Sequence, residues 1–412
     1  MTPEQLQQAW GAGQIVPLVC SAEQEQWRQA WGAADPAAVL HQLQQDHGPG
    51  VLAGSGGSLG ERRWCLQPLA HLRASAQATG QWLRLQGLDP AHCLHLNPLP
   101  PHHVSGLMPW VRAWHWGGTC IDLEPQLLRD GAALAAALPA AELQATGAVL
   151  LSLVPTQLHR LLAYPPAVEW LQQLSVIWVG GAPLPAALAE QARQLGLRLA
   201  PCYGSTETAA MVCVQSPERF LAGEPGCGQP LDDVALRVDC ASGALELKTE
   251  RLSPGALHQG RWLPLTRSRD GWWRSSDAAQ LSASGLQIMG RLDGAIHSGG
   301  ETVFPEQVEL TLRALIAAQG VPLRELLLLS EADPQWGERL VALLRFDAGA
   351  GTDLAPWIEQ LTALARRLPP AQRPAQWVVC PDLAPTVTGK WQRQRWQAWL
   401  RTAKSGATAQ QP

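Results

Sequence analysis

A strand, a helix and a second strand follow one another between Leu174 and Tyr203, and this succession constrains the fold more than any other part of the sequence. The apolar run SVIWVGG predicts a buried strand, PAALAEQARQLG predicts an amphipathic helix that ends at Gly196, and LRLAPCYG predicts a second buried strand. Parallel strands cannot be joined by a tight turn and need a crossover of this length. The segment therefore predicts a βαβ unit, and similar apolar runs before Asp122 and after Gly147 extend it to a doubly wound α/β sheet.

The sequence pattern changes twice further along the chain. From Gly226 to Leu265, short alternating segments interrupted by glycine and proline predict a small antiparallel β region. After Arg291 the pattern is typical of a separate α+β domain of ordinary size, with helices over 305–318 and 354–367 and strands over 324–329 and 340–346. We therefore expect a large domain over residues 1–292, a mobile domain over 293–404 and a disordered tail over 405–412.

Composition excludes several classes of function. A chain of 412 residues with 16% charged residues and a net charge of -4 offers no basic surface for nucleic acid. The nine cysteines are scattered, with no CxxC pair and no local cluster with histidine, which argues against a disulfide framework or a structural zinc site. The first ten residues, MTPEQLQQAW, lack the pattern of a secretion signal, and the longest apolar runs are too short to span a bilayer. These features favour a cytoplasmic enzyme that acts on small molecules.

Four motifs occur in a fixed order. They are YGSTET at 203–208, WWRSSD at 272–277, GRLDGAIHSGGETVFPEQVE at 290–309, and TGK, which ends at Lys390. Lys390 is one of only three lysines in a chain whose other basic residues are arginines, although an exposed lysine is by itself commonplace. A strand-to-helix turn capped by a hydroxyl is the structural alternative for YGSTET.

In this order, and over nearly the whole chain, these motifs resemble the core motifs of the adenylate-forming superfamily of acyl-CoA and aryl-CoA ligases, peptide synthetase adenylation domains and luciferases. Three further segments are most similar to the o-succinylbenzoate:CoA ligases of menaquinone and phylloquinone biosynthesis: PPHHVSGL at 100–107, VGGAPL at 179–184 and SGGE at 298–301. The resemblance implies ATP, Mg²⁺ and CoA as ligands. The chain departs from the family near its start: the segment in the place of the phosphate loop already begins near Ala53, so we expect the N-terminal part of the large domain to be shortened.

The resemblance also implies a role for each nucleotide-binding residue. Tyr203 would pack on adenine, Thr206 would contact the AMP phosphate, and Glu207 would help to hold Mg²⁺, which prefers oxygen ligands. Asp277 would accept hydrogen bonds from both ribose hydroxyls, and Arg291 would contact ribose or phosphate. The glycines that would let the backbone lie against the nucleotide are Gly180, Gly181 and Gly204.

The segment AGSGGSLGERRWC, at 53–65, occupies the place of the family's phosphate loop. Glycines allow backbone N–H groups to approach phosphate, and hydroxyls add donors. Aligned with the family pattern, Ser58 and Gly60 fall in the loop and Arg63 stands where a lysine is usual. A flexible turn is the alternative interpretation, since clusters of glycine and serine usually mark loops.

The remaining assignments concern the second half of the reaction and the acid. The resemblance places Asp293 at a hinge about which the C-terminal domain rotates, and it places Gly299 and Gly300 beside the pantetheine tunnel. His103 matches a family histidine beside the acyl pocket, although it could equally be a structural loop histidine. Arg112 is a candidate anchor for a substrate carboxylate, with a surface or salt-bridged arginine as the alternative.

The implied reaction has two steps: a carboxylate attacks the α-phosphate of ATP to give an acyl-adenylate with Lys390 offsetting the developing charge, and CoA then displaces AMP. Two alternatives stay open from the sequence. The acid could be an aryl, medium-chain or amino acid, and the chain could be a binding protein that keeps the fold without turnover.

Overall fold

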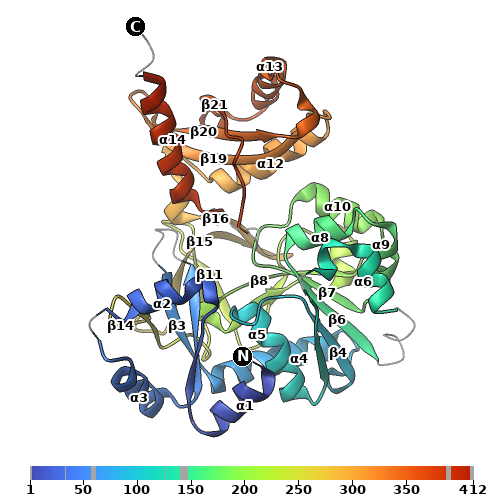
Figure 1. Cartoon of the computed structure of the whole chain (residues 1–412), viewed down its shortest axis with the longest axis vertical. Helices are drawn as coiled ribbons and strands as arrows, with labels where there is room; N and C mark the ends of the chain where they lie inside the picture. Colours follow the sequence, from blue (N-terminus) through green and yellow to red (C-terminus); the bar gives the residue numbers. More distant parts are fainter. Residues whose placement is uncertain are drawn as a thin grey trace.

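The structure is a computed structural model and describes residues 2–32, 34–56, 62–124, 126–139, 147–386 and 391–408. In Figure 1 the elements up to α11 form the lower part of the molecule, and α12 to α14 with β19 to β21 form the orange-to-red upper part. The first helix, α1 (Pro3–Gly11), lies in the lower part, and the last, α14 (Arg393–Thr408), belongs to the upper part.

The largest sheet has seven strands in the order β10-β9-β8-β7-β6-β4-β5. The predicted parallel arrangement is confirmed, because β5, β4, β6, β7 and β8 pair in parallel, whereas β9 pairs antiparallel with β8 and β10 antiparallel with β9. The strands are β4 Cys93–Asn97, β5 Thr119–Asp122, β6 Ala148–Leu153, β7 Val176–Val179, β8 Leu199–Ser205, β9 Ala210–Val214 and β10 Gln229–Pro230.

Helices cover both faces of this sheet, as the prediction of a doubly wound fold requires. Successive residues of a strand point to opposite faces. Ile177 of β7 packs with the core on the side of α6, α8, α9 and α10, whereas its neighbour Trp178 packs with Ala78 and Leu83 of α4 on the other side. The predicted βαβ unit is present as β7, α10 and β8.

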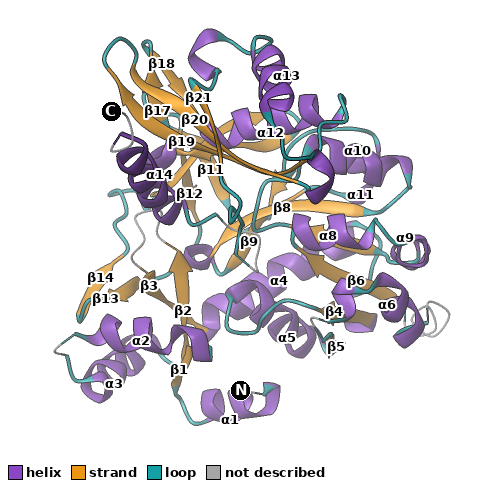
Figure 2. Ribbon diagram, turned by 45° about the horizontal axis from the view of Figure 1, so that its top comes forward, coloured by secondary structure: helices purple, strands orange, loops and turns teal. Residues whose placement is uncertain are grey.

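A second sheet, in the order β1-β2-β3-β13-β14, stands beside the first (Figure 2). It joins the beginning of the chain to a much later segment, since Cys65 and Trp64 of β3 pair with Ala256 and Leu257 of β13. The predicted antiparallel region over 226–265 is therefore divided between sheets, with β13 and β14 in this one. The strands are β1 Ile15–Leu18, β2 Gly50–Gly56, β3 Arg62–Pro68, β13 Gly255–His258 and β14 Arg261–Pro264.

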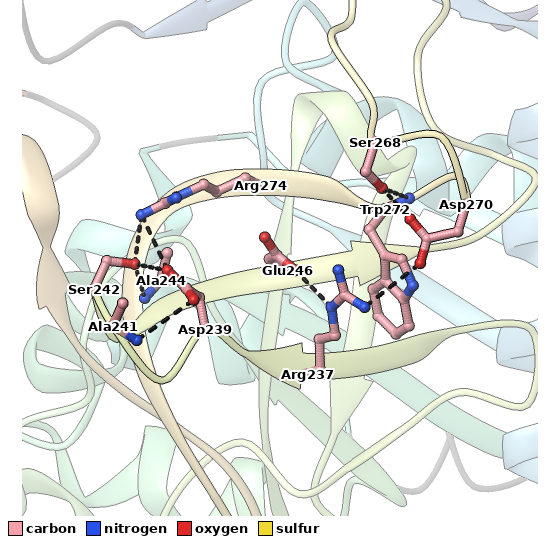
Figure 3. A network of polar contacts seen from close by, with 10 residues as sticks. All are labelled: Arg237, Asp239, Ala241, Ser242, Ala244, Glu246, Ser268, Asp270, Trp272 and Arg274. Carbon is pink, nitrogen blue, oxygen red and sulfur yellow. Dashed lines mark hydrogen bonds and ion pairs between the residues drawn. The ribbon is translucent and has the colours of Figure 1, made fainter.

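A third, four-stranded antiparallel sheet has the order β11-β12-β15-β16, with β11 Ala235–Val238, β12 Ala244–Lys248, β15 Trp273–Ser282 and β16 Gly285–Arg291. Polar contacts on its surface fix the start of β15 (Figure 3). The Arg237 guanidinium donates to Glu246 at 2.6 Å, lies 3.6 Å from Asp270 and stacks over the Trp272 ring at 4.3 Å. These contacts anchor the loop that leads into the WWRSSD motif.

The chain after Arg291 forms a fourth sheet of five strands, with β17 Ile296–Ser298, β18 Glu301–Val303, β19 Leu323–Asp333, β20 Gly337–Phe346 and β21 Gln376–Val379. The helices and strands predicted for this part are confirmed as α12, β19, β20 and α13. The sheet has its own apolar core, formed with α12 and α13. These features support the proposed domain boundary near residue 293, which stays a prediction.

The α-helices are α1 Pro3–Gly11, α2 Gln24–Trp31, α3 Pro36–His47, α4 Leu69–Leu85, α5 Val104–Trp116, α6 Gly131–Ala137, α8 Pro155–Leu161, α9 Pro165–Gln172, α10 Ala186–Gln194, α11 Pro217–Leu221, α12 Pro305–Ala317, α13 Ala355–Ala365 and α14 Arg393–Thr408. Proline at the first helical turn starts many of them, because it has no N–H to leave unpaired there. Across the described ranges, none of these helices has both the length and the apolar character needed to cross a membrane.

The predicted disordered tail needs one correction. Helix α14 continues to Thr408, so residues 405–408 are helical, while residues 409–412 lie outside the described residues. Trp396 and Leu400 pack α14 against Leu327 and Leu343 of the adjoining sheet. Once packing has fixed the first turns of a helix, extending it by further residues costs little free energy. The helix therefore continues beyond residue 404, where we expected it to end.

Candidate active site

The candidate site lies at the carboxyl ends of parallel strands, where open α/β sheets bind ligands. Gly180 and Gly181 follow β7, Tyr203 and Gly204 end β8, and the segment that contains His103 follows β4. Gly180 is tightly enclosed, because a Cβ at this position would lie 2.8 Å from the Cys202 sulfur. A side chain there would push the two strand ends apart.

The YGSTET segment ends in a tight, strained turn, η4 (Thr206–Thr208). The Thr208 hydroxyl accepts a hydrogen bond from the Ser205 N–H at 3.0 Å and donates to the Ala210 carbonyl at 2.7 Å. Directly after it, Ala209 and Ala210 have φ values of +52° and +73°, which L-residues rarely adopt. Such strain is concentrated at functional sites, where the surrounding structure must hold it in place.

A buried arginine, Arg251, holds this turn in place, and no sequence motif identified it. Arg251 is 0% exposed, and its Nη1 donates to the Thr208 carbonyl at 2.6 Å. Its Nε and Nη2 donate to the two carboxylate oxygens of Asp233 at 2.5 and 3.2 Å. No short motif links Arg251 to Thr208, so only the folded chain shows this contact.

Glu207 is held against β2 and β3, the strands on either side of the predicted phosphate loop. The Ser55 hydroxyl of β2 donates to Glu207 Oε1 at 2.5 Å, and Gln67 Nε2 of β3 donates to the Thr206 carbonyl at 2.5 Å. Arg63 is exposed and is paired across β2 and β3 with Ser55, which places both on one face of the sheet. Ser58 and Gly60 lie outside the described residues.

Tyr203 and Asp277 meet although they lie on different sheets. The Tyr203 hydroxyl donates to Asp277 Oδ2 at 2.5 Å, while Arg291 Nη1 lies 3.8 Å from Asp277 Oδ1. Burial raises the pKa of the Asp277 carboxyl, although the Tyr203 hydrogen bond and the Arg291 charge act in the opposite direction. Burial also raises the pKa of the Tyr203 phenol well above its ordinary value, which keeps it a hydrogen-bond donor.

Arg291 connects this pair to the predicted hinge. Its Nε and Nη2 donate to the two carboxylate oxygens of Asp293 at 3.1 and 2.8 Å. Asp293 lies in η5 (Leu292–Gly294), between β16 and β17. The same guanidinium therefore contacts the predicted ribose ligand Asp277 and the first residues of the C-terminal part.

Arg112 is buried, which excludes the alternative of a surface arginine. It lies on α5, is 5% exposed, and its guanidinium carbon is 4.8 Å from the centre of the Trp178 ring. Among the described residues no acidic side chain forms an ion pair with it, and its Nε has no hydrogen-bond partner. Burial lowers the pKa of Arg112 to about 10, a value at which it is still charged at neutral pH.

His95 lies beside Arg112 and was not identified from the sequence. Its ring lies 5.4 Å from that of Trp178, and its buried Nε2 has no hydrogen-bond partner among the described residues. Burial, together with the Arg112 charge, lowers the pKa of His95 well below its usual value, so the ring is neutral. Two buried polar groups without partners in one place are costly unless a ligand satisfies them.

Comparisons with known proteins agree with this geometry. Residues 68–249 match the family described as "AMP-binding enzyme". The 2-succinylbenzoate–CoA ligase of Salmonella typhimurium is 32% identical over 80% of this chain and 64% of its own length, and that of Escherichia coli is 31% identical over 74% and 60%. A solved Escherichia coli MenE variant with bound OSB-AMS is 28% identical, with a TM-score of 0.60, over 85% of this chain and 68% of its own.

The chain is similar to AMP-binding enzymes over residues 68–249 and to 2-succinylbenzoate–CoA ligases over a longer stretch. It spans less than two thirds of the length of the two ligases with which it was aligned. Bacillus subtilis MenE in complex with ATP and magnesium, at 20% identity and a TM-score of 0.65 over 84% of this chain and 69% of its own, shares the fold.

The SGGE segment, which joins β17 to β18, contacts the turn between β19 and β20. The Gly299 N–H donates to the Trp336 carbonyl at 2.9 Å, and Gly299 has a φ of +57°. A Cβ at Gly299 would lie 2.6 Å from the Trp336 ring, so glycine is required there. Gly300, the second glycine predicted to line the pantetheine tunnel, follows in the same turn.

Two predicted site residues remain. His103 is the N-cap residue of α5, and Lys390 lies outside the described residues.

Proposed function

We propose that this protein is an ATP-dependent acid–thiol ligase that converts o-succinylbenzoate to its CoA thioester and releases AMP, in menaquinone or phylloquinone biosynthesis. The observation that carries the proposal is the junction of Tyr203, Asp277 and Arg291 at the end of β8, which would hold adenine and ribose together. The curated ligases with which the chain aligns support the same acid and thiol. We propose a cytoplasmic location, where ATP and CoA are available.

The first step would be attack of the acid's carboxylate on the α-phosphate of ATP, with pyrophosphate leaving. Tyr203 would stack on adenine, and the Asp277 carboxylate would accept hydrogen bonds from the ribose hydroxyls. Thr206 would donate to the α-phosphate, and Arg63 lies opposite Ser55 on one face of its sheet. Glu207, a carboxylate held by Ser55, suits the oxygen preference of Mg²⁺, which would neutralise phosphate charge when bound.

Lys390 would bridge the carboxylate and phosphate oxygens in this step, where charge develops. The C-terminal part would then turn about Asp293, which would remove Lys390 and bring Gly299 and Gly300 to the site for the CoA thiol. The thiol would attack the acyl carbon and AMP would leave, so no covalent enzyme intermediate is required.

The buried side of the site supports an acid with a second carboxylate. Arg112 carries a charge with no acidic partner among the described residues, and an unpaired buried charge is costly. A substrate carboxylate would pair with it through charge-assisted hydrogen bonds, and the neutral His95 ring could donate another. His103, at the start of α5, would border the same pocket.

One assay distinguishes o-succinylbenzoate from the alternative acids and a ligase from a non-catalytic binding protein. Acid-dependent ATP–pyrophosphate exchange, measured over a panel of acids and followed by CoA-dependent release of AMP, should be fastest with o-succinylbenzoate. Faster turnover of benzoate or of a fatty acid would reject the proposed substrate but keep the ligase chemistry. Absence of exchange with every acid, in protein that binds ATP, would favour the binding protein.

A further inference from the structure

Three potential metal ligands, Cys20, Glu23 and His102, meet in the part of the molecule that precedes α5. Cys20 precedes η1 (Ser21–Glu23), Glu23 ends it, and His102 lies between β4 and α5. One ligand atom of each, the Cys20 sulfur, a Glu23 carboxylate oxygen and a His102 ring nitrogen, lie within 4.8 Å of one another. It is the one group of this kind found in the described part of the chain.

The carboxylate of this group is largely buried, and one of its two oxygens is already paired with an arginine. The Glu23 side chain is only 9% exposed, and its Oε1 forms an ion pair with Arg62 at 2.6 Å. Its Oε2 faces Cys20, whose backbone N–H donates to it at 3.4 Å. A carboxylate oxygen has two lone pairs, so Oε2 can keep this weak hydrogen bond and still bind a metal.

We propose that Cys20, Glu23 and His102 form a zinc site with its fourth position open to water. A thiolate and an imidazole are ligands for zinc, whereas Mg²⁺ and Ca²⁺ take oxygen ligands. Tetrahedral zinc with ordinary bond lengths places its ligand atoms about 3.3–3.8 Å apart, so a closure of about 1 Å completes the site. Cys20 and His102 are partly exposed and can move by this amount.

Binding requires no redox partner. The Cys20 thiol gives its proton to solvent, and its sulfur, a Glu23 oxygen and a His102 nitrogen then form bonds to the ion. The ion would fasten the segment after β1 to the loop that precedes α5, where the rings of His102 and His103 lie 4.4 Å apart. The site would thus brace the loop beside the proposed acyl pocket, and it does not depend on the proposed ligase activity.

Cobalt(II) binding to the metal-stripped, full-length protein tests the proposal, because a thiolate ligand gives a charge-transfer absorption in the near ultraviolet. We expect about one equivalent of Co²⁺ to produce this band and zinc to abolish it. Cys20→Ser should remove the band, and His102→Gln should weaken binding at least about tenfold, since even changes beyond the ligands themselves commonly have this effect. Cys240→Ser, at an exposed cysteine, is the matched control and should keep the band.

Circular dichroism and thermal unfolding should first show that each variant is folded. A band that persists in folded Cys20→Ser, that disappears in Cys240→Ser, or that never forms in the parent protein would overturn the proposal. If Cys20→Ser does not fold, unchanged cobalt affinity in His102→Gln would overturn it by itself.

Discussion

The hydroxyl of Tyr203 donates a hydrogen bond to Oδ2 of Asp277 at 2.5 Å, across 74 residues of sequence and between two different sheets. The bond fixes the aspartate so that its other oxygen faces the Arg291 side. One oxygen of the proposed ribose ligand accepts this bond, so Tyr203 would share the carboxylate with the ribose.

Asp277→Ala should raise the KM for ATP at least about tenfold, because hydrogen bonds to a charged group contribute about 1.5–3 kcal/mol. The KM for CoA should stay within about twofold of the parent value. Tyr203→Phe leaves the carboxylate in place and should have a smaller effect on the ATP KM. Steady-state kinetics with each substrate varied in turn measures these KM values. An equal rise in the KM for ATP and the KM for CoA would contradict a ribose role for Asp277.

Lys390→Ala should reduce acyl-adenylate formation by at least about a hundredfold, as when other preorganised groups that stabilise transition-state charge are removed. Thioester formation from pre-made acyl-adenylate and CoA should be retained. Lys248→Ala, at an exposed lysine on β12, is the control and should leave both steps unchanged. A parallel loss of both half-reactions in Lys390→Ala would refute the assigned division of labour.

Arg112→Met keeps much of the side-chain volume but removes the charge that we assign to the second carboxylate. The KM for o-succinylbenzoate should rise at least about tenfold, consistent with loss of a charge-assisted interaction, while the KM for ATP stays unchanged. Benzoate, which has no second carboxylate, provides the control substrate and should be affected less. An equal loss with both acids would assign Arg112 to packing alone.

Arg251→Met should destabilise the fold by about 3 kcal/mol, because it leaves the Asp233 carboxylate and the Thr208 carbonyl without their partner. The double variant Arg251→Met, Asp233→Asn should be less destabilised than the sum of the single variants, since the two side chains form one ion pair. Chemical denaturation of the four proteins measures this coupling. Strict additivity would show that the pair does not act as a unit.

His71, on α4, should make the protein less stable in mild acid. Burial, with the charges of Arg267, His47 and Arg251 and against that of Glu250, lowers its pKa to about 4. The unfolded chain therefore binds a proton near pH 6.5 that the folded chain resists until about pH 4, so stability falls as the pH is lowered through this window.

His71→Gln should accordingly lose less thermal stability than the parent protein between pH 6.5 and 4.5. Midpoint temperatures recorded across this range test the prediction. His159→Gln, at an exposed histidine of α8, is the matched control and should follow the parent curve. Parallel curves for the parent and for His71→Gln would show that another group controls the acid sensitivity.

Many of the helices and strands could be predicted from local sequence patterns. The order of apolar runs and amphipathic segments predicted β7, α10 and β8, and similar patterns predicted α12, β19, β20 and α13. These predictions succeed because the periodicity of apolar residues is a property of residues that are close in sequence. Contacts between segments far apart in the sequence could not be predicted from such local patterns. The bond from Ser55 to Glu207 spans 152 residues, and no spacing rule connects a serine of β2 to a glutamate after β8.

Some of the site residues could be predicted from local motifs, whereas others could not. Tyr203, Glu207 and Asp277 belong to motifs that occur in a fixed order, so their roles could be predicted by resemblance. Arg251 and His95 could not, because their significance comes from complete burial beside groups on other elements. The cluster of Cys20, Glu23 and His102 could not be found from the sequence either, since folding brings together three side chains that no short sequence window contains.

The pairing of β3 with β13 also sets the order in which the chain can be completed during synthesis. Trp64 and Cys65 emerge from the ribosome about 190 residues before their partners Leu257 and Ala256, and pairing over such a separation is slow to form. Until then β3 has a free edge on that side, next to the segment that carries the phosphate loop. Nascent chains that stall before Gly255 should therefore expose this edge to aggregation, and a chaperone that covers it would act on the protein before its nucleotide site exists.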